Sequence, residues 1–202
     1  TVMTRLKSVF ICQQCGAESP KWIGKCPSCG QWNTYVEEVI STGKKPVTSG
    51  ANAGDSRPVP LEEIAMLHLE RINVGMDEFN RVLGGGLVPG SMVLIGGEPG
   101  IGKSTLVLQL ALTLKGKKIL YASGEESLQQ IKLRAMRLKL TSKECLFYCE
   151  TSLESLLAVL EEEKPDVFIM DSIQTISTEV IESSPGSVSQ VRECTSSLLK
   201  YA

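Results

Sequence analysis

Eight residues, from Gly97 to Ser104, have the spacing G-x-x-x-x-G-K-[ST] of a phosphate-binding loop, or P-loop. A nucleoside triphosphate needs several backbone N–H groups that converge on its phosphates. A glycine-rich turn into a helix N-terminus supplies them, and the helix dipole favours the negative charge. We therefore expect this loop to bind ATP with Mg²⁺. The candidate nucleotide-binding residues are Gly97, Glu98, Pro99, Gly100, Ile101, Gly102, Lys103, Ser104 and Thr105.

The residue types in this loop predict separate roles at the nucleotide. The backbone N–H groups from Gly100 to Ser104 would surround the β-phosphate. The Lys103 ammonium would reach the β- and γ-phosphates, and the Ser104 hydroxyl would bind Mg²⁺. Thr105 follows and is a candidate for the α-phosphate. An apolar run before the loop and a helix-prone run after it favour this assignment over an ordinary glycine-rich turn.

Two acidic positions further along the chain are expected to complete the site. The apolar run 167–171 ends in Asp171, which is the Walker B pattern, and the carboxyl end of a buried parallel strand borders the ligand crevice. Asp171 is therefore the candidate partner of Ser104 in holding Mg²⁺. Glu125 could orient and deprotonate the attacking water, with Glu126 as the alternative, or either could be only the acidic first turn of the next helix. The candidate catalytic residues are Lys103, Glu125 and Asp171.

A second group of reactive side chains lies near the N-terminus. Cys12 and Cys15 form one C-x-x-C pair, Cys26 and Cys29 form another, and ten residues separate the two pairs. Zn²⁺ binds four thiolates tetrahedrally, and a segment of about 30 residues cannot bury enough apolar surface to fold without such a crosslink. We therefore expect a zinc ribbon ligated by these four cysteines. Its zinc would be structural rather than catalytic, because four thiolates leave no open coordination position for a substrate. A redox dithiol is the alternative.

Two tryptophans flank the second cysteine pair. Trp22 and Trp32 are expected to pack around the metal, or alternatively to offer a stacking surface for bases or for a partner. Lys7, Lys21 and Lys25 lie nearby in the sequence and would suit phosphate. The sequence leaves the choice between these alternatives open.

The composition of the 202 residues is that of a globular protein, with 42% hydrophobic residues and a net charge of −2. No apolar run approaches the roughly 20 residues of a membrane span, and no secretory signal is evident, so a cytoplasmic protein without membrane contact is expected. The charges are uneven. Residues 103–145 hold nine Lys or Arg against three acids, and residues 150–193 hold two against ten. A basic face of this kind suits DNA or phosphate, or is simply a solvated helix surface.

Apolar and amphipathic runs alternate through the second half of the chain. Such alternation predicts an α/β fold in which helices cover both faces of a parallel sheet. Ser127 and Ser152 are suitable N-caps, and Lys164-Pro165 ends a helix. The expected strands are 92–96, 119–123, 146–149 and 167–171, and the expected helices are 103–114, 127–138, 152–163 and 188–199.

These patterns divide the chain into three parts. Residues 1–38 would form the zinc ribbon, residues 39–60 a flexible linker rich in Ser, Gly and Pro, and residues 61–202 the P-loop ATPase domain. The polar segment 183–193 is expected to be a mobile, ligand-gated loop in which Arg192 could contact DNA phosphate.

The remaining reactive side chains carry less information. His68 is the only histidine, so a His-based triad or a His metal cluster is excluded. The other three cysteines share no metal-like spacing and are expected to be buried small hydrophobic residues. They are Cys145, Cys149 and Cys194.

The chain resembles the bacterial RadA (Sms) family of DNA-repair proteins, which are RecA-like ATPases with an N-terminal C4 zinc motif. The resemblance implies a homo-hexameric ring in the full-length protein that binds ATP at subunit interfaces and moves on single-stranded DNA. It further implies branch migration of branched DNA recombination intermediates, with a RecA-type recombinase as partner. By the same resemblance, Glu125 is the water-activating glutamate and Gly186–Arg192 lies near the DNA-facing loop. The stretches that carry it are the cysteine pairs with Lys21-Trp22 between them, Gly75–Gly90, the P-loop, Ser123–Ser127, Val167–Gln174 and Gly186–Arg192.

The resemblance also predicts an N-terminal fragment with a truncated core. The family continues with a Lys-Asn-Arg-Phe motif and a Lon-protease-like domain, and neither occurs in these residues. A later strand of RecA-like cores lies between the P-loop strand and the Walker B strand. The sheet is therefore expected to have unpaired edges, and the isolated chain to bind nucleotide weakly and to hydrolyse it slowly.

The sequence is compatible with two functions. One is a DNA-dependent ATPase motor, an ATP hydrolase of the helicase type. The other is a nucleotide-gated adaptor that docks repair partners through the zinc ribbon. On the grounds of the resemblance, the zinc module and the Gly84–Gly90 run disfavour a third possibility, a replicative helicase or a circadian-clock-type relative.

Overall fold

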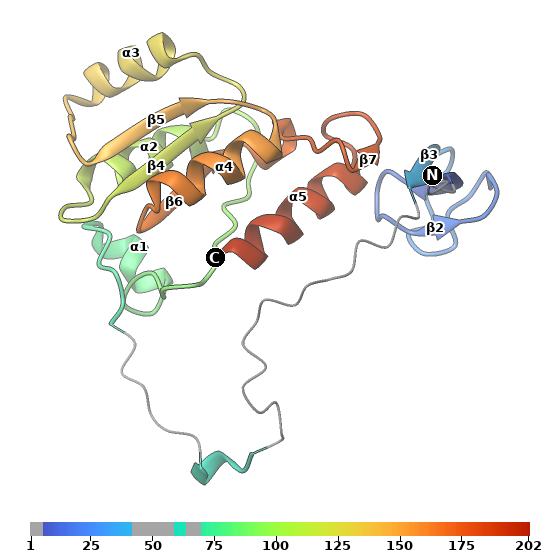
Figure 1. Ribbon diagram of the computed structural model, residues 1–202, viewed down its shortest axis with the longest axis horizontal. Helices are drawn as coiled ribbons and strands as arrows, with labels where there is room; N and C mark the ends of the chain where they lie inside the picture. Colours follow the sequence, from blue (N-terminus) through green and yellow to red (C-terminus); the bar gives the residue numbers. More distant parts are fainter. Residues whose placement is uncertain (1–5, 42–58, 64–69) are drawn as a thin grey trace.

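The computed structural model describes residues 6–41, 59–63 and 70–202 (Figure 1). Most of the range predicted to be a linker lies outside these residues, as does His68. Among the described helices, none is long and apolar enough to cross a lipid bilayer.

The N-terminal part is a small antiparallel sheet around the cysteines. Strand β1 (Leu6–Cys12) pairs along its whole length with β3 (Tyr35–Ser41), and the short β2 (Glu18–Ser19) pairs with the other edge of β1. The buried core cluster here consists of Cys12, Cys26 and Tyr35, and Ile11 and Glu38 are also buried. So small a core fits the expectation that a metal supplies much of the stability.

This ribbon is joined to the rest of the chain by an added strand. β7 (Ile181–Glu182) pairs antiparallel with residues 39 and 40 of β3, which makes the sheet order β2-β1-β3-β7. The Val188 N–H also donates to Gln13 Oε1 at 3.4 Å, and Arg192 Nη2 donates to the Gly16 carbonyl at 3.4 Å. Because β3 continues to Ser41, the first three residues of the predicted linker are strand.

A parallel three-stranded sheet forms the centre of the larger part. Its order is β5 (Cys145–Cys149), β4 (Ile119–Ser123), β6 (Val167–Asp171). All five residues of β4 are buried. Ile119 and Tyr121 pack with α2 (Lys103–Thr113) and α3 (Leu128–Leu138). Leu120 and Ala122 pack on the opposite face with α4 (Leu153–Glu163) and α5 (Val188–Tyr201).

Helices therefore cover both faces of a parallel sheet, as predicted (Figure 1). The helix starts follow local rules. Ser127 and Gln130 form a capping box on α3, and the Ser152 and Ser187 side chains accept from the third residue of α4 and α5. Lys164 ends α4 in the left-handed conformation. The remaining short elements are the 3-10 turns Leu61–Glu63 and Ile173–Thr175 and the helix α1 (Asp77–Val82).

The strand predicted at 92–96 is absent, which corrects the sequence-based expectation. This segment has no strand assignment, and Leu94 is 84% exposed. Strands are held by hydrogen bonds to a neighbour, and the described sheet ends at β6 without placing a strand beside residues 92–96. An apolar run without a partner strand stays irregular, so its composition alone was misleading.

Candidate functional site

The P-loop leads directly into α2. Gly102 is the residue before the helix, and its φ of 102° lies in the left-handed region that a side chain would disfavour. The Lys103 ammonium reaches back across the loop and donates to the carbonyls of Gly97 at 2.8 Å and Glu98 at 2.9 Å. The predicted phosphate-binding lysine thus lies at the mouth of its own loop, where phosphate oxygens can replace the carbonyls as acceptors.

The loop and the end of β6 meet, although 67 residues separate the two contacting side chains. The Ser104 hydroxyl donates to Asp171 Oδ1 at 3.1 Å. The predicted pair of Mg²⁺ ligands is therefore adjacent, and a hydroxyl beside a carboxylate is a donor set that Mg²⁺ accepts. Both oxygens face the carboxyl end of the parallel sheet, where α/β folds bind nucleotides.

Tyr121 is a part of this site that sequence reasoning missed. Its hydroxyl donates to Asp171 Oδ2 at 2.8 Å from the neighbouring strand β4, and the tyrosine is 1% exposed. Burial, followed by the hydrogen bond to Asp171, raises the pKa of Tyr121 far above its usual value, so the phenol stays protonated and donates. The available signal was a tyrosine inside an otherwise apolar buried strand, because its hydroxyl must find a partner.

The two candidate glutamates have different surroundings. Glu125 Oε1 accepts from the Ser172 hydroxyl at 2.6 Å, immediately after Asp171. Glu126 forms an ion pair with Arg134 on α3. The geometry thus favours Glu125 over Glu126 as the carboxylate near the nucleotide, while Glu126 has a structural partner.

Gly124 makes this turn possible. Its N–H donates to the Asp171 carbonyl at 3.1 Å, which holds the ends of β4 and β6 together. A Cβ at this position would lie 2.0 Å from Thr175 Oγ1, far inside van der Waals contact. Only glycine allows the turn that carries Glu125 to pack this closely on the segment after Asp171.

The segment after β6 is held by one buried side chain. Gln190 is 1% exposed and donates to the carbonyls of Thr178, Ile181 and Ser183 at 3.0 to 3.2 Å. Of these acceptors, only Ser183 belongs to the region 183–193 that we expected to be a mobile loop, and residues 188–193 of that region lie in α5. Arg192 donates to the Gly16 carbonyl of the zinc ribbon, while the residue as a whole stays exposed.

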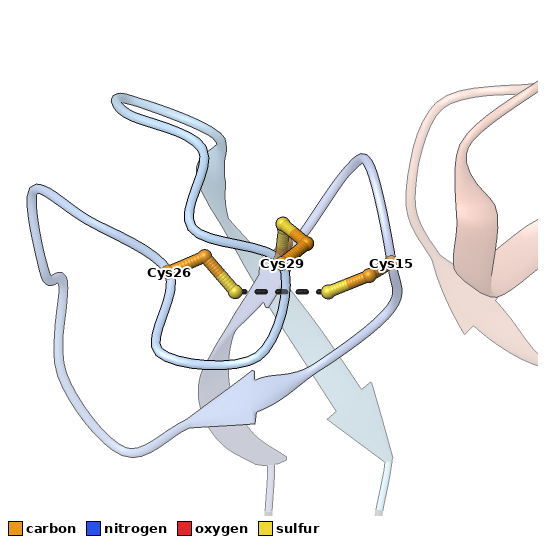
Figure 2. A group of neighbouring side chains, drawn as sticks. Cys15, Cys26 and Cys29 are labelled. Atoms are coloured by element: carbon orange, nitrogen blue, oxygen red, sulfur yellow. Dashed lines mark hydrogen bonds between the residues drawn. The ribbon is translucent and has the colours of Figure 1, made fainter.

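The four predicted zinc ligands converge. The sulfur atoms of Cys12, Cys15, Cys26 and Cys29 all lie within 4.8 Å of one another. The sulfur atoms of Cys12 and Cys29 are 3.7 Å apart. Those of Cys15 and Cys26 are 3.6 Å apart (Figure 2). A tetrahedron with Zn–S bonds of about 2.3 Å has edges of about 3.8 Å, so the donor set fits Zn²⁺. None of the four forms a disulfide.

Hydrogen bonds prepare this cluster for a metal. The backbone N–H of Cys29 is the main reason that the pKa of Cys26 is lowered to about 6, and the Tyr35 hydroxyl also stabilises the thiolate. The same contact raises the pKa of Tyr35 to about 12, because its phenol donates to Cys26. A thiolate is the form that binds zinc, so these bonds favour the ligand state at Cys26. Although a backbone hydrogen bond from Gln31 lowers it, burial and the hydrogen bonds with the other cysteines raise the pKa of Cys29 to about 12, so the Cys29 proton must leave when the metal binds.

Two predictions about side-chain burial need correction. Trp22 and Trp32 do not pack around the cysteines, since they are 53% and 67% exposed, and the partly buried residues at the cluster are Phe10, Ala17 and Ile23. Cys145 and Cys194 are buried as expected, but Cys149 is exposed because it ends the edge strand β5.

The regions that match known protein families contain the four cysteines and the P-loop. Residues 10–37 match a family described as a rubredoxin metal binding domain, and residues 72–145 match an ATPase family described as KaiC. Proteins named "DNA repair protein RadA" match nearly the whole chain. The one from Listeria monocytogenes is 50% identical over 96% of this chain, and the one from Bacillus subtilis is 50% identical over 99%. One from Streptococcus pyogenes is 49% identical over 99%.

These matches confirm the resemblance and the cofactors predicted from the sequence. The KaiC match is confined to the ATPase region, whereas the RadA matches include the ribbon. Zn²⁺ and ATP with Mg²⁺ are the cofactors that the two matched families and the four-cysteine cluster support. The chain spans 43 to 45% of the length of the relatives described above.

Proposed function

Since about half of its residues are identical to those of RadA proteins over nearly the whole chain, we propose that this chain is the ATP-binding and zinc-binding part of a DNA-repair ATPase. The observation that carries the proposal is the contact between Ser104 and Asp171. It joins the two sequence motifs of an ATPase, which lie far apart in the chain, at the carboxyl edge of the sheet.

Each residue of the site has a proposed role. The loop 97–105 binds the phosphates, with Lys103 exchanging its two backbone acceptors for phosphate oxygens. Ser104 and Asp171 hold Mg²⁺, which neutralises charge on the phosphates when bound. Tyr121 orients Asp171, and Glu125 accepts a proton from the attacking water. Ser172 holds the Glu125 carboxylate in place.

The finer activity rests on resemblance to the RadA relatives. We propose hydrolysis stimulated by single-stranded DNA, a hexameric ring, branch migration of recombination intermediates and a RecA-type partner. A nucleotide-gated adaptor is the second candidate, and the observation that favours it is the pairing of β3 with β7, which ties the ribbon to the segment following the ATP site. The cytoplasmic location and the site assignments stay predictions.

ATP hydrolysis with and without single-stranded DNA tests the two candidates. It is measured for this chain and for the longer Bacillus subtilis relative, each beside the variant corresponding to Lys103→Ala. A motor requires DNA stimulation in the longer protein that disappears in the lysine variant. A hydrolysis rate that does not change when DNA is added would favour the adaptor. We expect slow hydrolysis by the chain itself.

The choice between the two glutamates has its own test. Glu125→Gln keeps the shape of the side chain but removes the base, so hydrolysis should fall by about 10²-fold or more while ATP binding is kept. Glu126→Gln loses only the partner of Arg134, so its main effect should be on stability. Equal loss of hydrolysis in both variants would contradict the proposed base.

A further inference from the structure

The exposed tryptophans form one small surface on the ribbon. Trp22 and Trp32 are the only tryptophans in the chain. Both rings border Gly24, since a Cβ there would lie 3.6 Å from the Trp22 ring and 3.8 Å from the Trp32 ring. Large aromatic side chains are usually buried, and half or more of each of these is open to water. Two such rings at one place indicate a contact surface.

A cation completes this surface. The Lys25 ammonium lies 5.6 Å from the centroid of the Trp32 ring, on its face. Lys21 is adjacent to Trp22 and is also exposed. From Ser19 to Tyr35 the chain holds these two lysines and no acidic residue, although the whole chain carries a net charge of −2. The surface is therefore locally positive.

The backbone holds the surface rigidly. Lys25 and Trp32 are paired across an antiparallel bridge, and the Asn33 N–H donates to the Gly24 carbonyl at 2.8 Å. The next bond inward, from the Cys26 N–H to the Gln31 carbonyl at 2.8 Å, belongs to the second cysteine turn. The positions of both rings therefore depend on the hairpin that carries two of the zinc ligands. A pre-ordered aromatic surface loses little entropy when it binds a ligand.

The chemistry of the surface selects its partner. Exposed aromatic faces beside lysines and without acids suit unpaired bases and their phosphates, because every base can stack on a ring and every phosphate attracts an ammonium. A duplex hides its base faces. A protein partner that inserted an apolar side chain would favour apolar surroundings. The exposed residues of the intervening turn are Pro27, Ser28, Cys29, Gly30 and Gln31, which are mostly polar or small.

We propose that Trp22, Trp32 and Lys25 form a stacking platform for single-stranded nucleic acid on the zinc ribbon, separate from the ATP site. The proposal relies on the proposed function for the identity of the strand as DNA. It assigns the ribbon a nucleic-acid contact that needs neither ATP nor hydrolysis. In this proposal the zinc stabilises the hairpin on which the two rings are exposed.

The tryptophans themselves report on this binding, since no other residue of the chain contributes indole fluorescence. The zinc-loaded chain is titrated with oligothymidylate of about 20 nucleotides, a length that spans the usual site sizes. We expect saturable quenching that weakens as salt rises. The Lys103→Ala variant should be quenched like the unmodified chain, so a failure of the ATPase proposal would leave this result intact. Absence of quenching at low salt would overturn the platform and leave a protein partner as its occupant.

Variants are compared by the anisotropy of a labelled oligothymidylate. Trp32→Ala should weaken binding at least about fivefold, and Trp32→Phe should recover much of the loss because stacking needs a ring. Lys25→Ala should also weaken binding of the oligothymidylate. Lys132→Ala removes an exposed lysine from α3 instead and, as the matched control, should leave the affinity unchanged. Zinc content, measured for each variant, verifies that the ribbon stays folded. Equal affinity of Trp32→Ala and the unmodified chain, with zinc retained, would refute the proposal.

Discussion

Replacing Tyr121 by phenylalanine removes a single oxygen from the proposed ATP site. The hydrogen bond that is lost joins the Tyr121 hydroxyl to the Asp171 carboxylate over 2.8 Å, and Tyr121 is 1% exposed. A hydrogen bond to a charged group contributes about 1.5–3 kcal/mol. For a chain of this size, that loss lowers Tm by roughly 3–12 °C. Asp171 keeps its contact with Ser104, so the variant should still fold.

Tyr201→Phe is the matched control. Its hydroxyl also donates a short bond, 2.7 Å to the Leu160 carbonyl, but the acceptor is neutral. Such a bond contributes about 0.5–1.5 kcal/mol, so this variant should lose less stability. Thermal unfolding of both variants, and of a double-mutant cycle with Asp171→Asn, measures the coupling. If Tyr121→Phe loses no more than Tyr201→Phe, or the cycle shows no coupling, the argument from charge and burial is wrong.

The same tyrosine predicts a pH dependence. Its pKa is raised in the folded state by burial first and by Asp171 second, so the folded chain holds this proton more tightly than the unfolded chain does. The stabilisation is fully present below about pH 10, the usual pKa of tyrosine, and is lost as the pH rises above that value. Tyr121→Phe should therefore flatten the alkaline decline in Tm. If Tm of the variant declines at alkaline pH as steeply as Tm of the unmodified chain, groups other than Tyr121 cause the decline.

Two further replacements test the zinc ribbon and the turn after β4. Cys26→Ser removes one of four converging thiolates, so zinc should be released and the ribbon should unfold while the α/β part keeps its helical signal. Zinc content and circular dichroism measure these two effects. Loss of helical signal throughout the chain would contradict independent folding of the two parts. Gly124→Ala places a Cβ 2.0 Å from Thr175 Oγ1 and should cost about 1–3 kcal/mol in a urea titration. Gly96→Ala is the matched control, because the φ of neither glycine lies in the left-handed region and a Cβ at Gly96 would meet nothing within 4 Å. Equal losses in the two glycine variants would mean that the close packing is not the cause.

Much of the fold could be predicted because it depends on short-range patterns. The runs 119–123 and 167–171 form strands with the predicted bounds, and Ser127 and Ser152 cap their helices. Apolar runs of strand length and capping side chains act within a few residues of one another, so a single sequence contains the information. The expectation at 92–96 was wrong for the complementary reason, since a strand also needs a neighbour.

The motifs of the sequence indicated which ligands and which chemistry to expect. The P-loop and the two cysteine pairs are contiguous motifs whose spacing states their ligands. Which side chains meet became clear from the three-dimensional fold. It brought Tyr121 to Asp171, separated Glu125 from Glu126 by giving the latter an ion pair with Arg134, and left both tryptophans exposed beside Lys25. These outcomes depend on packing between segments distant in the chain, and neither spacing nor composition encodes that packing at any one position.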